Sequence, residues 1–311
     1  MLDGDGGRGK TPKNKMLKET RPAMKLRQLR ISRRSIAIAA ALVGTASLVI
    51  GAHAALNKRA LDAAKAVAAE RSAEAFKHPA RVALVIGNGN YPDSNTPLAQ
   101  PINDARALTA ALRRNGFDVD VVEDATKDDM DRAVARLKAK VKPDSVVMLF
   151  FGGYGIQAGP ESYMIPVDAA IWKESDVRRN AVSVESVLEA MKEQGACAKL
   201  VVIDASRRNP YERRFRAYSH GLAPISSPDN ALILTSATPG KVADDGNGEH
   251  SVLVSELLNN LNVQAALAET IFNKTRIAIS RASDGEQVPT VSSSLFDEIR
   301  LGDAAATNAG G

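Results

Sequence analysis

The chain has a single cysteine, Cys197, among 311 residues. One cysteine excludes an intrachain disulfide, and the four histidines do not stand at zinc-ligand spacing. Because Cys197 precedes an apolar run, we expect it to be a small packing residue rather than a nucleophile. A helix start explains Asp128, Asp129 and Asp131, and a turn explains the Asp244–Asp245 pair. The sequence therefore predicts no metal site and no cofactor, with calcium at these carboxylates as the open alternative.

Phosphate-binding and nucleic-acid-binding patterns are also missing. Gly87-Asn-Gly-Asn follows an apolar run but lacks the third glycine of a dinucleotide loop and the Gly-Lys-Ser/Thr of a P-loop. The net charge of +5 comes from residues 1–34, which hold eleven Lys/Arg and three Asp/Glu, leaving 30 basic and 33 acidic residues elsewhere. Binding to nucleic acid needs a basic face on the folded part, so we expect none.

A run without any Asp, Glu, Lys or Arg extends over the 21 residues Ile36–Leu56. The basic flank, the apolar run and Ala52-His53-Ala54 match the three parts of a secretory signal peptide; an uncleaved membrane anchor is the alternative. The junction Ser32-Arg33-Arg34-Ser35-Ile36 resembles a bacterial twin-arginine export signal. Positively charged flanks of an apolar segment stay on the cytoplasmic side of the membrane. Either interpretation therefore places the C-terminal part of the chain outside the cytoplasm, in the periplasm or anchored at the inner membrane.

Composition divides the chain into five parts. They are a basic arm at 1–34, a signal peptide or anchor at 35–56, an Ala-rich helical stalk at 57–79, a folded domain at 80–302 and a flexible tail at 303–311.

Within the domain, strand-like and helix-like segments alternate. Apolar runs predict strands at Val82–Ile86, Phe117–Val122, Ser145–Phe151, Leu200–Ile203 and Ala231–Ser236. Helical periodicity predicts helices at Asn103–Arg114, Lys127–Lys140, Val184–Met191, Val252–Leu261 and Val263–Ala282. Such alternation predicts an α/β fold with a mostly parallel central sheet and helices on both faces.

Two strings carry a family resemblance: FFGGYGIQ at Phe150–Gln157 and LVVIDASRRNP at Leu200–Pro210. They resemble the catalytic strings of the caspase-like cysteine peptidases, the group that includes metacaspases and paracaspases, here in a bacterial form. Further ordered matches are ALVIGNGNY, Asn103-Asp104-Ala105, SYMIPVDA, SATPGKVADDGNGEHS and Gln287-Val288-Pro289. The resemblance implies a caspase-like three-layer sandwich.

The sequence departs from the family at both catalytic positions: Tyr154 stands at the family's histidine and Ser206 at its cysteine. A thiol and an imidazole both titrate near neutrality, whereas a phenol is a poor base and a serine needs an adjacent base. We therefore expect a silent peptidase centre and a binding or regulatory module that holds a peptide or protein segment in the former substrate cleft.

The alternative is an active hydrolase or endopeptidase with Ser206 as nucleophile. His220 or His250 would then be the base, with Tyr154 as an oxyanion donor; the competing interpretation of either histidine is a solvated loop residue. In metacaspases the residue matching Asp204 lines a pocket for a basic side chain, so the resemblance implies substrate binding by Asp204, and Asp104 is placed with it. Alternatively, Asp204 caps a turn and Asp104 caps the first helix.

Overall fold

The computed structural model describes residues 79–92, 97–205, 222–243, 248–263 and 266–301, together with Lys58, Leu61 and Lys65, which are helical. Contacts divide the chain into two units, Met1–Glu70 and Arg71–Gly311. Among the described residues no helix is long and apolar enough to cross a membrane. The predicted signal peptide or anchor at 35–56 lies outside these residues, as do the basic arm and the C-terminal tail.

Six strands form the central sheet in the order β10-β8-β7-β3-β1-β2. Each pair is parallel except β10 with β8, which is antiparallel. Strands β1, β3, β7 and β8 are buried almost throughout, because both faces of the sheet are covered, and this explains their continuous apolar sequences. The strands are β1 (Arg81–Gly87), β2 (Asp118–Glu123), β3 (Val146–Gly152), β7 (Ala198–Asp204), β8 (Ala231–Thr235) and β10 (Thr290–Ser293).

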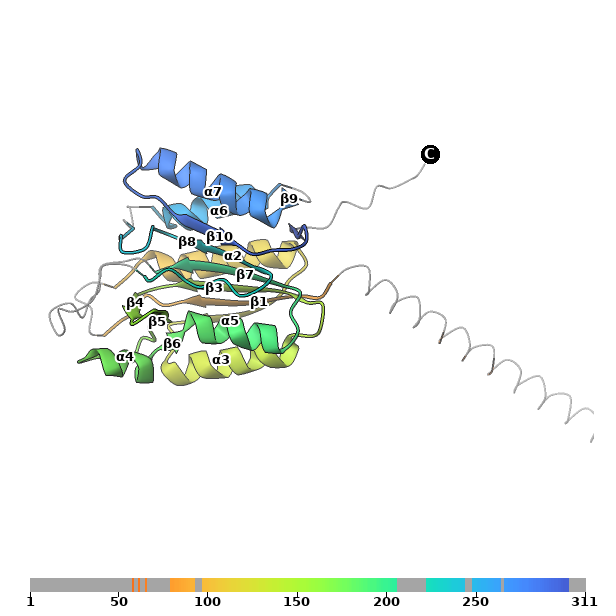
Figure 1. Ribbon diagram of the computed structural model, residues 1–311, viewed down its shortest axis with the longest axis horizontal. Coiled ribbons are helices and arrows are strands. Elements are labelled where there is room, and N and C mark those ends of the chain that lie inside the picture. Colours follow the sequence, from red (N-terminus) through yellow and green to blue (C-terminus); the bar gives the residue numbers. More distant parts are fainter. Residues whose placement is uncertain are drawn as a thin grey trace, which may run out of the picture. The chain divides into compact units, whose positions relative to one another are not determined.

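Helices cover the two faces of the sheet (Figure 1). Alternate residues of β1 point to opposite faces, as the strand period requires. Leu84 and Ile86 pack in the cluster formed with α3 (Lys127–Lys140) and α5 (Val184–Glu193). Ala83 and Val85 pack in the cluster on the other face. That second face is covered by α2 (Gln100–Arg114), α6 (Val252–Leu261) and α7 (Ala268–Ala282).

A smaller antiparallel sheet, β4-β5-β6, follows the carboxyl end of β3. Its strands are β4 (Gly155–Ala158), β5 (Glu161–Met164) and β6 (Val182–Ser183), and α4 (Glu174–Asn180) packs beside β4 (Figure 1). At the other end of the chain β9 (Ala266–Leu267) pairs with β11 (Arg300–Leu301). The architecture is an α/β sandwich of three layers, as expected.

The described elements confirm the predicted alternation and correct some of its boundaries. Helices at Lys127–Lys140 and Val252–Leu261 have the predicted bounds. Helix α2 begins at Gln100 instead of Asn103, because a proline is tolerated in the first turn, where its missing N–H has no partner to lose. Helix α7 begins at Ala268 instead of Val263, since Ala266–Leu267 pairs with β11. The short strands were not predicted from the sequence, because they are too brief to show a period.

Candidate functional site at the carboxyl edge of the sheet

The neighbouring strands β3 and β7 end in register at one edge of the sheet. Gly152 of β3 pairs with Asp204 of β7. Beyond the pair, the Gly153 N–H donates to the Asp204 carbonyl and the Gly155 N–H donates to the Ala205 carbonyl, both at 3.2 Å. These bonds hold Tyr154 beside the end of β7. Ser206 and His220 lie outside the described residues, so the roles expected of them as nucleophile and base stay predictions.

Tyr154 is packed like a core residue, with 8% of its surface exposed. Its ring meets the Tyr91 ring edge-on, with centroids 4.7 Å apart. The Tyr154 N–H donates to the Tyr91 hydroxyl, which donates to the Ile165 carbonyl, both at 3.0 Å. A Cβ on Gly153 would lie 2.5 Å from the same hydroxyl, so only glycine fits there. The Tyr154 ring is thus held in an apolar cluster beside the end of β7.

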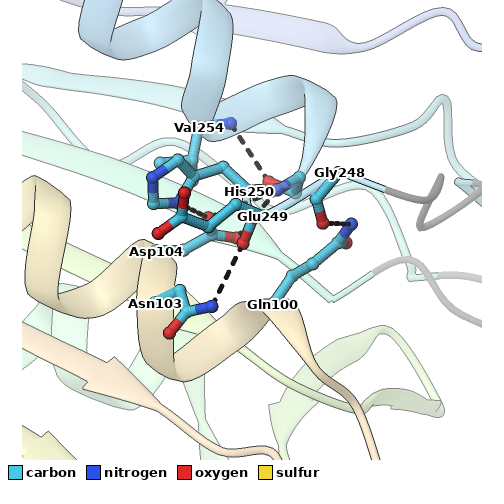
Figure 2. Close-up of polar contacts among 8 residues, drawn as sticks. Gln100, Asn103, Asp104, Gly248, Glu249, His250 and Val254 are labelled. Carbon is cyan, nitrogen blue, oxygen red and sulfur yellow. Dashed lines mark hydrogen bonds and ion pairs between the residues drawn. The ribbon is translucent and has the colours of Figure 1, made fainter.

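Asp104 of α2 has a buried carboxylate held from the chain segment before α6 (Figure 2). His250 Nδ1 lies 2.9 Å from Asp104 Oδ1. The Ser251 N–H donates to both carboxylate oxygens at 3.2 Å. The side chain of His250 is 25% exposed and that of Asp104 is 1% exposed, so the imidazole reaches solvent while the carboxylate that it contacts is buried.

A second buried carboxylate acts on Asp104 at this edge. Asp204 ends β7 and is 3% exposed. Burial and, next in size, the negative charge of Asp204 raise the pKa of Asp104 to about 6. Hydrogen bonds from Ser251 and His250 act in the opposite direction and lower this pKa. The edge is therefore an acidic site in which one carboxylate titrates just below neutral pH.

The first turns of α2 fix the segment that carries His250. Gln100 Nε2 donates to the Gly248 carbonyl at 3.0 Å, and Asn103 Nδ2 donates to the Glu249 carbonyl at 3.3 Å (Figure 2). Ser251 caps α6, since its Oγ accepts from the Val254 N–H at 3.1 Å. The imidazole is thus positioned from both sides by backbone contacts.

Of the six predicted site residues, the structure brings Asp104 together with His250 and Asp204. Tyr154 lies just beyond the pairing of Gly152 with Asp204. The alternative role of Asp104 as cap of the first helix is wrong, because Ala99 is the N-cap of α2 and Asp104 is in the helix body. The alternative of a solvated loop histidine is wrong for His250, which contacts Asp104.

Four residues that build the site were not predicted from the sequence as site residues: Gln100, Asn103, Ser251 and Tyr91. A signal existed for two of them. Gln100, Asn103 and Asp104 stand at i, i+3 and i+4, the spacing of one helix face.

Cys197 lies away from this edge, immediately before β7 begins at Ala198. Its Sγ donates to the Asp144 carbonyl at 3.2 Å, and burial raises the pKa of the thiol. A reactive thiol needs a lowered pKa, so Cys197 does not replace the nucleophile of the site. Within the part of the chain that the structure describes, no three His, Cys, Asp or Glu side chains group as metal ligands.

Comparison with known proteins gives one family and two relatives. The family model described as "Caspase domain" matches residues 80–300. The mucosa-associated lymphoid tissue lymphoma translocation protein 1 of Homo sapiens is 32% identical over 133 residues, which are 42% of this chain and 16% of that protein. Its homolog in Mus musculus is 31% identical over 133 residues, with the same shares. The chain therefore matches only a small part of the length of these curated relatives.

Proposed function

The chain belongs to the caspase-domain family, and from that premise we propose that it is a silent member which binds a basic side chain of a peptide or protein segment in the former substrate cleft. The peptidase fold is retained. What changes is the catalytic pair, which in the family is a nucleophilic thiol and the imidazole that activates it. The observation that carries the binding role is the acidic pair Asp104 and Asp204.

The silent centre is supported by the two replaced positions. Tyr154 stands at the family's histidine, and its ring packs against Tyr91 in a buried cluster. Ser206 stands at the family's cysteine. A serine hydroxyl becomes a nucleophile only when a base takes its proton, and a phenol is a poor proton acceptor at neutral pH.

Binding of a basic side chain is supported by the unfavourable free energy of keeping Asp104 ionised and buried near a second carboxylate. Two carboxylates buried near each other are disfavoured by desolvation and by repulsion, as the raised pKa of Asp104 expresses. The positive charge of a guanidinium or ammonium group would offset this repulsion, and a guanidinium also forms paired hydrogen bonds with carboxylates. The site thus favours a ligand with an arginine or lysine side chain.

The binding test uses the full chain in a non-ionic detergent and a fluorescent peptide with one arginine. A peptide with citrulline in its place has the same shape without the charge. We expect the arginine peptide to bind at about pH 7.5 and the citrulline peptide at least about tenfold more weakly, since one charge-assisted contact is worth about that much.

Asp104→Asn and Asp204→Asn should each remove this preference for arginine. The matched control is Asp131→Asn, an exposed residue of α3 that pairs with Lys127. Equal binding of the two peptides to the unmodified protein would refute the basic-side-chain pocket.

The silent-centre test measures cleavage after Arg or Lys. We expect no turnover by the unmodified protein. Tyr154→His combined with Ser206→Cys restores a thiol and an imidazole at the same two strand ends, and neither single change supplies both groups. Turnover by the unmodified protein that disappears in Ser206→Ala would contradict the silent centre.

A second candidate is an active hydrolase with Ser206 as nucleophile, and the contact between His250 and Asp104 favours it. A carboxylate at one ring nitrogen orients an imidazole so that its other nitrogen can accept a hydroxyl proton, as in serine hydrolases. Ser206 follows Asp204 by two residues. His220 is the other candidate base. Turnover lost in both Ser206→Ala and His250→Ala, and kept in His220→Ala, would establish this candidate.

The location of the domain is part of the same proposal. The basic arm, the apolar run Ile36–Leu56 and the Arg33-Arg34 pair support an exported or membrane-tethered protein. If the run is not cleaved, residues 35–56 are the membrane contact.

A further inference from the structure

The segment 153–155 connects the turn after β1 with the end of β7. On one side, the Tyr154 N–H donates to the Tyr91 hydroxyl at 3.0 Å. On the other side, the N–H groups of the two flanking glycines donate to the carbonyls of Asp204 and Ala205, both at 3.2 Å. A series of backbone and side-chain hydrogen bonds therefore runs from Tyr91 to the residue that carries one carboxylate of the acidic site.

The two glycines of this segment allow a close approach on both sides. A Cβ on Gly153 would lie 2.5 Å from the Tyr91 hydroxyl, and a Cβ on Gly155 would lie 2.9 Å from the Ala205 Cβ. Both distances are shorter than any normal contact of a Cβ, so a larger residue at either position would push the segment away from that neighbour. The segment is thus fitted to Tyr91 on one side and to the end of β7 on the other.

The Tyr91 hydroxyl has a defined direction. It donates to the Ile165 carbonyl at 3.0 Å, and that carbonyl also accepts from Asn88 Nδ2 at 3.1 Å. A hydroxyl has one proton and two lone pairs, so a lone pair faces the Tyr154 N–H once the proton is directed to Ile165. The Ile165 N–H in turn donates to the Tyr154 carbonyl at 3.0 Å. Tyr91 and Ile165 therefore hold both backbone polar groups of Tyr154.

The turn that carries Tyr91 is itself fixed from the end of β2. The Asp124 carboxylate accepts from the backbone N–H groups of Gly89 and Asn90, both at 2.9 Å. The Tyr91 N–H donates to the Gly89 carbonyl at 3.2 Å, and Tyr91 is only 4% exposed. Because its backbone is held and its ring is buried, the hydroxyl is a fixed contact for the segment 153–155.

We propose that Tyr91 is a positioning residue of the acidic site: its hydroxyl holds Tyr154 and, through the segment 153–155, fixes the end of β7 that carries Asp204. This role rests on the proposed binding function. Tyr91 does not contact the ligand in it. By limiting the motion of the end of β7 before a ligand arrives, the hydroxyl reduces the entropy that binding must remove, and such preorganisation raises affinity.

The first measurement is amide hydrogen exchange of the full chain in non-ionic detergent, read by mass spectrometry of peptides that cover 153–155. Tyr91→Phe keeps the ring and removes the hydroxyl, so the Tyr154 N–H loses its acceptor. We expect all three amides of the segment to exchange about tenfold faster, since one hydrogen bond changes a local opening equilibrium by about that factor. Exchange in α7, which lies outside the site, should not change.

The second measurement is binding of the arginine and citrulline peptides to the same variant at about pH 7.5. We expect the Kd of the arginine peptide to rise about fivefold, because Asp204 is held less firmly although no charge has been removed. The citrulline peptide lacks the charge that Asp204 attracts, so its Kd should change less.

Tyr163→Phe is the matched control. Tyr163 belongs to the same apolar cluster, and its hydroxyl donates to the Glu161 carboxylate instead of to Ile165. This variant should leave exchange in 153–155 and peptide binding unchanged. Gly153→Ala tests the contact from the other side, because its methyl group would displace the Tyr91 hydroxyl. It should reproduce the faster exchange with Tyr91 in place.

Three exchange results would overturn the proposal. They are unchanged exchange in 153–155 of both Tyr91→Phe and Gly153→Ala, faster exchange of a single amide, which would mean that the effect does not reach β7, and an equal rise in α7, which would mean general destabilisation.

Peptide binding separates this inference from the proposed function. If the unmodified protein binds the two peptides equally, the pocket is refuted and the positioning role fails with it. If the unmodified protein prefers the arginine peptide and Tyr91→Phe binds that peptide as tightly despite faster exchange, the pocket stands and the positioning role is refuted.

Discussion

At the scale of single residues, Asp104 shows how one position can have opposite effects on stability and binding. Its carboxylate is 1% exposed and lies within the field of Asp204. Burial favours the protonated form in the folded chain, whereas the unfolded chain ionises at the ordinary pKa of 3.8. Ionised Asp104 therefore destabilises the fold while creating the charge that a basic ligand needs.

The pH dependence of stability should reveal this cost. With a folded pKa of about 6, the stability that Asp104 contributes is present below about pH 4 and is lost as pH rises through 6. Asp104→Asn removes that loss. The free energy of unfolding of the variant, relative to the unmodified protein, should rise by up to about 3 kcal/mol between about pH 4 and 7.

Urea unfolding of the full chain at several pH values measures the difference. Asp131→Asn on the exposed face of α3 should stay within about 0.5 kcal/mol of the unmodified protein throughout. If the free energy of unfolding depends on pH in the same way for Asp104→Asn and for the unmodified protein, the pKa of Asp104 is not raised in the folded chain. Gained stability with lost peptide binding would separate the binding defect from unfolding.

At the scale of elements, the start of α6 connects helix stability with site geometry. Ser251 caps the helix through its Oγ and presents its N–H to Asp104. The same residue therefore fixes the helix end and the carboxylate. The loop before it and the first turns of α2 form one polar contact surface (Figure 2).

Ser251→Ala removes the cap and keeps the N–H. We expect a loss of about 1 kcal/mol in the free energy of unfolding, the usual value of a serine N-cap. Ser255→Ala makes the same chemical change within the body of α6 and should cost less than about 0.5 kcal/mol. Urea unfolding compares them. Equal stability of the two variants would mean that the helix end is held by its other contacts.

At the scale of the whole molecule, the predicted export signal and the caspase domain occupy different parts of the chain. The proposed location depends on residues 1–56, whereas the acidic site lies within 80–300. The two proposals can therefore be tested separately.

A reporter enzyme that is active only outside the cytoplasm, fused after Gly311, should be active in bacteria. Changing Arg33 and Arg34 to Lys should abolish that activity, because the twin-arginine route reads the arginine pair and not the charge alone. Arg27→Lys with Arg30→Lys is the matched control and should have no effect. Activity that survives the first change would refute the twin-arginine route, and an inactive reporter on the unmodified chain would refute export.

Much of the domain was predictable because its information is local. A strand buried on both faces must be apolar throughout, so the runs VVMLFF and LVVI predict β3 and β7. Helices α3 and α6 follow from a helical period. Strands of two to four residues, such as β6 and β9, have no period to detect and depend on their partners.

The sequence by itself determined the α/β class and the strand ends that carry the candidate site. Tertiary structure alone decided the partner of Asp104. His250 is 146 residues away, and no local pattern distinguishes a carboxylate that caps a helix from one that binds an imidazole. That choice follows from how α2 and the start of α6 pack on the sheet, which brings the Asp104 carboxylate into contact with His250 and into the field of Asp204.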